Sequence, residues 1–299
     1  MPSRRVLITG ASKGIGWVVA HRLAEDGHQP IGLARSAPHD FPGQFHEVDL
    51  ADRAATAATL DKIVSEAAVD AVVNNVGFAQ FGRIGSIDLD HLFDTYDLNV
   101  RTAVQVVQAA LPAMVAGGWG RIVNVTSLTT LGTPERTPYA AAKAALETCT
   151  RIWAGELASA GITVNAVAPG PTETEMYRER SPVGSEREAR FLGTIPLHRV
   201  AKPLEIAAAI CFLLDEDAGY ITGQSCVSTV AEALPHDCDR KATARRTAGC
   251  LVGGAVAAVG RRRRHLCGRR SGRDTPIGIL SRRSRRRVVG VARVRQCSR

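Results

Sequence analysis

Short apolar runs alternate with helical segments along residues 6–168, and this alternation constrains the fold more than any other feature. Strands that run parallel must be joined by crossover connections, and helices on those connections cover both faces of the sheet. We therefore predict an α/β fold, a single doubly wound parallel sheet of the Rossmann type. The apolar runs lie at residues 6–8, 29–33, 45–50, 71–74, 122–125 and 162–168.

A glycine-rich loop follows the first of these runs and leads into a helical pattern. Glycines let the backbone turn tightly and approach a pyrophosphate, which then binds at the helix N-terminus. A strand, a glycine turn and a helix start are the context that a dinucleotide-binding site needs. The loop residues that we expect to contact the dinucleotide are Gly10, Ser12, Lys13, Gly14, Ile15 and Gly16.

The end of the second strand indicates which dinucleotide is bound. NAD sites usually place an Asp or Glu here, whereas an arginine accommodates the 2′-phosphate of NADP. This strand ends in Ala34-Arg35-Ser36, without an acid, and Lys13 adds a second cation. We therefore expect NADP(H) to be favoured over NAD(H).

Tyr139 and Lys143 are four residues apart in a helical segment, so both side chains can point into the same space. A nearby ammonium favours a phenolate, and we expect Lys143 to lower the pKa of Tyr139 and fit it for proton transfer. Ser127 follows the apolar run at 122–125, so its hydroxyl lies where ligands bind in open parallel sheets.

Together these segments resemble the short-chain dehydrogenase/reductase family, including its 3-oxoacyl-carrier-protein reductases, over roughly residues 4–224. The motifs that carry the resemblance are TGASKGIG at 9–16, NNVG at 74–77, Asn99, Ser127, YAAAK at 139–143 and PGPTET at 169–174.

The resemblance implies a role for each matched residue. Tyr139 is the general acid/base, and Ser127 holds and polarises the substrate carbonyl. Lys143 lowers the tyrosine pKa and binds the nicotinamide ribose, while Asn99, in a helical region at 87–115, supports a water that relays protons. The remaining residues expected to contact the cofactor are Asp49, Leu50, Asn75, Pro169, Gly170, Thr172 and Thr174.

The implied reaction is reversible hydride transfer that reduces a ketone or 3-oxoacyl-type carbonyl to a secondary alcohol. An NAD-dependent secondary-alcohol dehydrogenase acting oxidatively is the alternative. We expect a lid over the small-molecule substrate at about 173–204, where arginines either hold an anionic substrate or form a solvated helix face. The resemblance also implies a homo-oligomer, a tetramer or a dimer. Without a secretory signal or an apolar run of membrane-spanning length, we expect a cytoplasmic protein.

The resemblance ends after Gln224, where a seventh edge strand is expected to be altered or missing. Residues 1–224 hold 19 Lys+Arg and 25 Asp+Glu, whereas residues 225–299 hold 19 and 4. We predict that 225–299 is an Arg-rich tail without regular structure. We hypothesise that it results from a reading frame shifted by the loss of one base near codon 225. The alternative is an arm that binds nucleic acid, for which no binding fold or aromatic pattern is present. The histidines show no metal-ligand spacing, so no metal site is expected.

Overall fold

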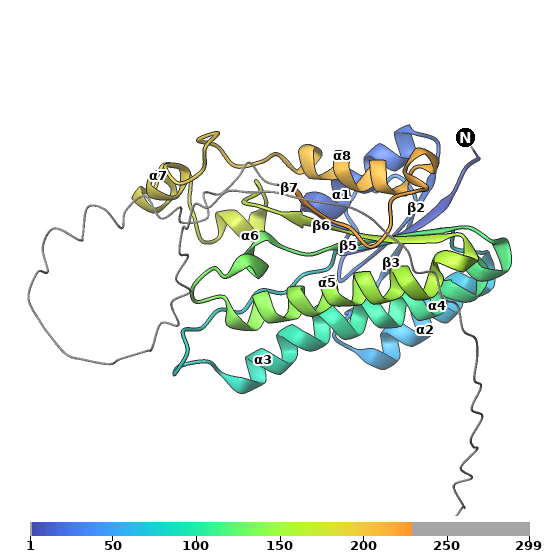
Figure 1. Cartoon of the computed structure of the whole chain (residues 1–299), viewed down its shortest axis with the longest axis horizontal. Helices are drawn as coiled ribbons and strands as arrows, with labels where there is room; N and C mark the ends of the chain where they lie inside the picture. The colour runs from blue at the N-terminus through green and yellow to red at the C-terminus, as the bar shows by residue number, and fades with distance from the viewer. Residues whose placement is uncertain (1, 229–299) are drawn as a thin grey trace, which may run out of the picture. The chain divides into compact units, whose positions relative to one another are not determined.

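The computed structural model describes residues 2–228, and these residues confirm the predicted α/β class. Seven parallel strands lie in the order β3-β2-β1-β4-β5-β6-β7 (Figure 1). The order reverses between β1 and β4, and ligands bind in open α/β sheets at the carboxyl ends of such a pair. The strands are β1 (Arg5–Thr9), β2 (Gln29–Ala34), β3 (Gln44–Glu47), β4 (Ala71–Asn74), β5 (Gly120–Val125), β6 (Ile162–Pro169) and β7 (Ser225–Ser228).

Helices follow the strands and cover both faces of the sheet (Figure 1). The α-helices are α1 (Gly14–Glu25), α2 (Arg53–Glu66), α3 (Leu89–Tyr96), α4 (Thr102–Gly117), α5 (Thr137–Leu157), α6 (Glu175–Arg178), α7 (Glu186–Leu192) and α8 (Pro203–Leu214). Short 3₁₀ turns lie at η2 (Leu128–Leu131), η3 (Ala158–Ala160) and η4 (Glu216–Ala218).

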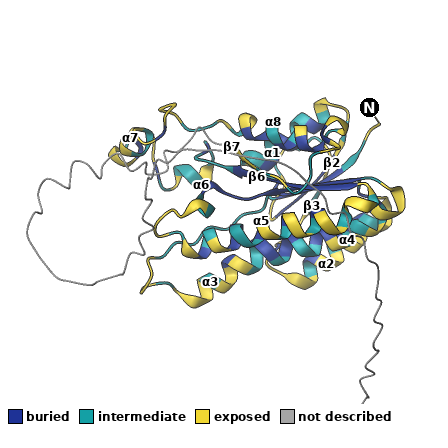
Figure 2. Ribbon diagram, in the orientation of Figure 1, coloured by how far each residue is buried: buried dark blue, intermediate teal, exposed yellow. Residues whose placement is uncertain are grey.

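Alternate side chains of each strand divide the apolar core into two layers. Val6 and Ile8 of β1 belong to the layer that contains α1 and α8. Leu7 belongs to the opposite layer, which is completed by α2, α4 and α5. Figure 2 shows the strands as the most buried part of the fold, because helices shield both faces. Strands buried in this way are continuous apolar runs, which is why they can be located in the sequence.

The helical region expected at 87–115 is interrupted in the structure. Between α3 and α4 the chain forms a π-helical turn, η1 (Asp97–Arg101), which holds Asn99. Such turns are rare inside helices and are frequent at functional sites. The turn therefore presents Asn99 differently from a residue of a regular α-helix.

The edge strand that was expected to be altered or missing is present. Residues 225–228 form β7, which pairs in parallel with β6 through partners such as Cys226 and Val167. Pairing uses backbone groups, so an unusual side-chain sequence still forms a strand. The residues at 229–299 lie outside the described part of the chain. The basic tail, its proposed frame shift and the nucleic-acid alternative therefore stay predictions.

Membrane-spanning helices and metal-ligand clusters are both absent from the described residues. No helix within 2–228 combines the length and apolar character needed to cross a bilayer. In the same residues, no group of three or more His, Cys, Asp and Glu side chains could hold a metal ion.

Gly16, in the first turn of α1, fixes how closely that helix approaches the β1–α1 turn. A Cβ at Gly16 would lie 2.5 Å from the Gly10 carbonyl oxygen and 2.6 Å from Asn75 Nδ2. That amide is itself fixed, since it donates hydrogen bonds of 3.0 Å to the carbonyl oxygens of Thr9 and Gly10. No side chain fits here without moving backbone.

We predict that Gly16→Ala lowers the free energy of unfolding by about 1–3 kcal/mol, the usual cost of overpacking. Alanine otherwise favours a helix over glycine, so a loss must come from the clash. Gly117→Ala is the matched control, because Gly117 is helical and no atom lies within 4 Å of the position that a Cβ would take there. Urea denaturation measures both variants. Equal stability of the two would contradict the packing argument.

Candidate active site

A cavity of about 1320 Å³ opens at the carboxyl ends of the strands. Among the predicted site residues, two lie off its wall: Gly16 packs behind the glycine loop, and Asn99 is buried in η1. The predicted residues that line the cavity are Gly10, Ser12, Lys13, Gly14, Ile15, Arg35, Asp49, Leu50, Asn75, Ser127, Tyr139, Lys143, Pro169, Gly170, Thr172 and Thr174.

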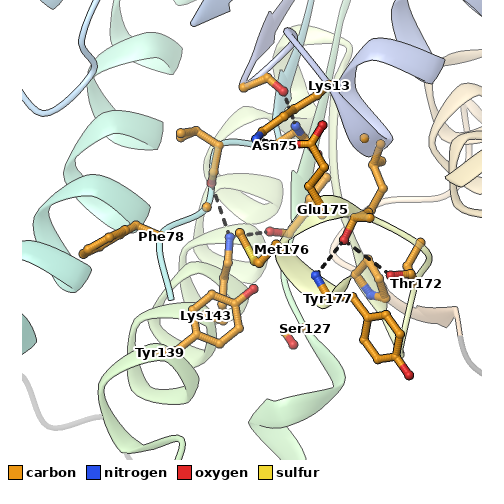
Figure 3. Close-up of a pocket in the computed structure, with 18 of the residues that line it drawn as sticks. Lys13, Asn75, Phe78, Ser127, Tyr139, Lys143, Thr172, Glu175, Met176 and Tyr177 are labelled. Atoms are coloured by element: carbon orange, nitrogen blue, oxygen red, sulfur yellow. Dashed lines mark hydrogen bonds and ion pairs between the residues drawn. The ribbon is translucent and has the colours of Figure 1, made fainter. Parts of the chain in front are cut away.

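Tyr139 and Lys143 project from adjacent turns of α5, and Ser127 stands at the end of β5 (Figure 3). The Lys143 Nζ lies 5.7 Å from the centre of the Tyr139 ring. Ser127 Oγ accepts hydrogen bonds from the backbone N–H of Thr129 at 3.2 Å and from its hydroxyl at 3.0 Å. Both lone pairs of the Ser127 hydroxyl are thereby used, so its own proton is left to donate.

Lys143 is buried, with 1% of its surface exposed. Its Nζ donates to the carbonyl oxygens of Val125 at 2.9 Å and of Val76 at 3.5 Å (Figure 3). Burial disfavours the charged ammonium and lowers the pKa of Lys143 to about 7. This amine therefore exchanges its proton near neutral pH.

The pKa of Tyr139 moves opposite to the direction expected from the sequence. Burial raises the pKa of this phenol to about 12, outweighing hydrogen bonding with Ser127 and the positive charge of Arg136, which both lower it. The sequence predicted a lowered pKa, whereas the net shift is upward, and Lys143 is not among the groups that lower it. Desolvation dominates here, and the lysine itself is partly neutral near pH 7. Tyr139 is consequently held as the protonated phenol, the form that donates a proton.

The Asn99 side chain lies beside Gly77, near the Lys143 amine. Its Nδ2 donates to the carbonyl oxygens of Phe78 at 2.8 Å and Thr95 at 2.7 Å. A Cβ placed on Gly77 would lie 3.7 Å from Lys143 Nζ and 3.8 Å from Asn99 Oδ1. A side chain at residue 77 would therefore contact both the Lys143 amine and the Asn99 amide oxygen.

The glycine loop fits a dinucleotide. Lys13 is the N-cap of α1 but makes no capping hydrogen bond with its side chain, so no side chain covers the first-turn N–H groups. Gly14 has a φ of +61°, which side chains rarely adopt, and both residues line the cavity. Uncapped N–H groups at a helix start bind anionic groups such as a pyrophosphate.

The two cations expected to meet a 2′-phosphate differ in the structure. Lys13 forms an ion pair with Glu175 of α6 (Figure 3). Arg35 lines the cavity and makes no ion pair within the described residues. Of these two cations, Arg35 is therefore the one whose charge is free, in the described part of the chain, to bind a phosphate.

Sequence reasoning missed three residues that surround the reacting groups. Thr129 orients Ser127, and Arg136 acts on the charge of Tyr139. Phe81 packs edge-on against Tyr139 with ring centres 6.5 Å apart. The first two are close in sequence to residues already identified, so their positions could have indicated them. Phe81 lies in the loop after β4 and carried no comparable signal.

The pKa of Lys143 is lower in the folded protein than in the unfolded chain, so the free energy of unfolding depends on pH. The unfolded lysine keeps its proton up to about pH 10.5, whereas the folded one releases it at about 7. Its contribution to stability therefore rises with pH between these values and is smallest below pH 7. We predict that the melting temperature of wild type rises relative to Lys143→Met from pH 7 to pH 10. A constant difference across this range would contradict a buried, titrating lysine.

Known proteins resemble this chain over most of its described residues. A family model described as "Enoyl-(Acyl carrier protein) reductase" matches residues 10–229. The protein named 3-oxoacyl-[acyl-carrier-protein] reductase FabG of Pseudomonas aeruginosa is 38% identical over 230 residues, which cover 73% of this chain and 92% of the relative. Its Escherichia coli counterpart is 36% identical over 229 residues, covering 73% and 93%.

Solved structures show the same fold. The ligand-free aldohexose dehydrogenase of Thermoplasma acidophilum matches with a TM-score of 0.73 at 27% identity, covering 78% of this chain and 96% of that one. A putative NAD(P) dependent gluconate 5-dehydrogenase from Beutenbergia cavernae, solved with bound NADP, matches with a TM-score of 0.73 at 28% identity, covering 78% and 97%. The chain therefore belongs to the short-chain dehydrogenase/reductase family of oxidoreductases.

Proposed function

We propose that this protein is an NADP(H)-dependent reductase that converts a ketone or 3-oxoacyl-type carbonyl into a secondary alcohol. The observation that carries the proposal is the pairing of two proton donors on one cavity wall. Tyr139 is kept protonated by burial, and the Ser127 hydroxyl has its lone pairs occupied by Thr129. A carbonyl oxygen accepts hydrogen bonds, so both groups suit it as substrate.

Bound NADPH supplies the hydride, and the protein supplies orientation and proton transfer. Ser127 donates a hydrogen bond to the carbonyl oxygen and polarises it. As negative charge develops on that oxygen, Tyr139 Oη gives up its proton to it. The alcohol leaves with the tyrosine proton, and Tyr139 must then be protonated again.

Lys143 and Asn99 provide the route for that proton. A lysine with a pKa of about 7 is present in both protonation states at neutral pH and can pass a proton on. Asn99 lies across Gly77 from the lysine amine, with its Nδ2 held by two backbone carbonyls. In this role Asn99 positions the relay and does not itself change protonation state.

The proposed cofactor is NADP(H) in preference to NAD(H). Arg35 lies on the cavity wall at the end of β2, and Ala34, Ser36 and Ala37 beside it carry no acid for the ribose hydroxyls. A solved relative has NADP bound. The opposing assignment, an NAD-dependent dehydrogenase working oxidatively, would need an acid for the ribose hydroxyls, and residues 34–37 offer none.

We also propose that the substrate is a small-molecule carbonyl compound and that the enzyme is a cytoplasmic homo-oligomer. The names of the relatives from Pseudomonas aeruginosa and Escherichia coli favour a 3-oxoacyl group. Oligomerisation is supported by large apolar side chains that stand exposed on helices, among them Phe93 of α3, Val115 of α4 and Ile152 of α5.

Replacing Tyr139 by phenylalanine removes the proposed acid and keeps the ring that packs on Phe81. We expect kcat for reduction of a ketone to fall by about 10²–10⁴-fold, the usual worth of general acid catalysis. Tyr96→Phe is the control, because Tyr96 is 47% exposed on α3. NADPH oxidation measured across a panel of ketones and β-ketoesters gives the rates. Unchanged turnover in Tyr139→Phe would exclude Tyr139 as the acid.

Replacing Arg35 by aspartate removes the cation proposed to bind the 2′-phosphate and supplies a ribose acceptor. We expect the ratio of kcat/KM for NADPH over NADH to fall by roughly tenfold or more, the range of hydrogen bonds to charged groups. Initial rates with each cofactor and one ketone measure the ratio, which cancels any general loss of active protein. A ratio equal to that of wild type would count against the phosphate site.

A further inference from the structure

The Phe81 ring is enclosed by two guanidinium groups. The central carbon of Arg180 lies 3.4 Å from the ring centre, and that of Arg136 lies 3.8 Å from it. Two groups this close to one centre would overlap on a single face, so they occupy opposite faces of the ring. Both contacts are cation–π interactions, in which the guanidinium is attracted to the face of the aromatic ring.

A third arginine completes this arginine cluster, which we define as Arg136, Arg180 and Arg187. Arg187 of α7 is near enough for its charge to lower the pKa of both other arginines, after the larger effect of their burial. The three come from the start of α5, the segment after α6, and α7. Folding therefore brings three like charges together from separate parts of the chain.

The arginine cluster lies beside the proposed reaction centre. All three arginines and Phe81 line the same cavity as Tyr139. They also line a smaller adjoining recess of about 360 Å³. Phe81 contacts both arginines, and its ring centre lies 6.5 Å from that of Tyr139. Arg136 is near enough to Tyr139 for its charge to act on that phenol. Arg35, the proposed phosphate ligand, follows β2, which β1 and β4 separate from β5.

Within residues 2–228, no member of the arginine cluster forms an ion pair. Nearby arginines do: Arg178 pairs with Glu173 and Glu188, and Arg83 pairs with Glu135, a carboxylate at the rim of the small recess. The donor that Arg180 does use is directed to the Ala79 carbonyl oxygen at 3.2 Å. Arg136 and Arg180 are half-buried, and Arg187 is exposed. Glu135 acts on the charge of Arg136 and Glu179 on that of Arg180, but in each case less strongly than the neighbouring arginines do. Mutually repelling cations that form no ion pair within the described residues are suited to an anionic ligand.

We propose that the arginine cluster binds an oxyanion of the substrate, a carboxylate or a phosphate, while Tyr139 protonates the carbonyl of the same molecule. This inference rests on the proposed function and extends it to the substrate class. A solvated helix face, the alternative for the lid arginines, does not account for Arg136 and Arg180 stacking on an inward-facing ring. A planar guanidinium recognises either oxyanion by paired hydrogen bonds.

Matched substrate pairs test the proposal on the full chain. The first pair sets 3-oxo acids of increasing length against their methyl esters. The second sets the acetoacetyl thioester of phosphopantetheine against that of pantetheine, which lacks the phosphate. We expect the anionic member of one pair to be preferred roughly tenfold or more, both in kcat/KM and in calorimetric Kd. The pair that shows the preference identifies the source of the oxyanion.

Three variants locate the preference. Arg180→Gln is expected to reduce the ratio of anionic to neutral substrate toward one, and Arg180→Lys, which keeps the charge but not the paired donors, is expected to retain part of it. Arg83→Gln is the control, since Arg83 is a nearby arginine already paired with Glu135 and is outside the cavity wall. It should retain the full ratio.

The two readouts separate this proposal from the proposed function. Equal binding of both members in both pairs, or a preference that survives Arg180→Gln, overturns the oxyanion site. If neutral ketones are reduced under those conditions, the reductase function still stands. If no ketone is reduced but the anion is bound preferentially and that preference is lost in Arg180→Gln, the oxyanion site stands and the reductase function does not.

Discussion

The site depends on the burial of one amine. Lys143 Nζ donates hydrogen bonds to the carbonyl oxygens of Val125 and Val76. Val125 is the last residue of β5, and Val76 lies just after the adjacent strand β4. Because β4 and β5 are adjacent and parallel, their carboxyl ends lie together and bring both carbonyls to the same amine. Burial lowers the pKa of Lys143 to about 7, so that both of its protonation states are present near neutral pH, and raises the pKa of the neighbouring Tyr139, which keeps that phenol protonated. In the proposed mechanism, the same desolvation thus prepares a proton donor and a proton carrier side by side.

Much of this arrangement could be predicted from the sequence, because it depends on local pattern. Buried parallel strands are continuous apolar runs, and the spacing of Tyr139 and Lys143 places them on adjacent turns of one helix. The direction of the tyrosine pKa could not be predicted, since burial is a property of the packed structure. The ion pair of Lys13 with Glu175 joins residues far apart in sequence, so no local sequence pattern predicts it.

The arginines of the segment predicted to be a lid are another case in which the sequence locates the residues but only the structure shows their contacts. In sequence they are one charge-rich stretch, and their individual roles cannot be separated. In the structure Arg178 pairs with Glu173 and Glu188, tying α6 to α7, whereas Arg180 turns inward onto Phe81. Arg178 therefore joins two parts of the segment predicted to be a lid, while Arg180 lines the cavity. The proposed proton chemistry and the proposed oxyanion site are therefore adjacent, at Tyr139 and Phe81.

The most direct measurement is a crystal structure of the chain with NADP⁺ and an unreactive ketone analogue bound. We predict that the carbonyl oxygen of the analogue accepts hydrogen bonds from both Tyr139 Oη and Ser127 Oγ. We also predict that Lys143 keeps its bond to the Val125 carbonyl oxygen. A carbonyl bound away from the Tyr139 hydroxyl, or a Tyr139 ring turned out of the cavity, would contradict this mechanism.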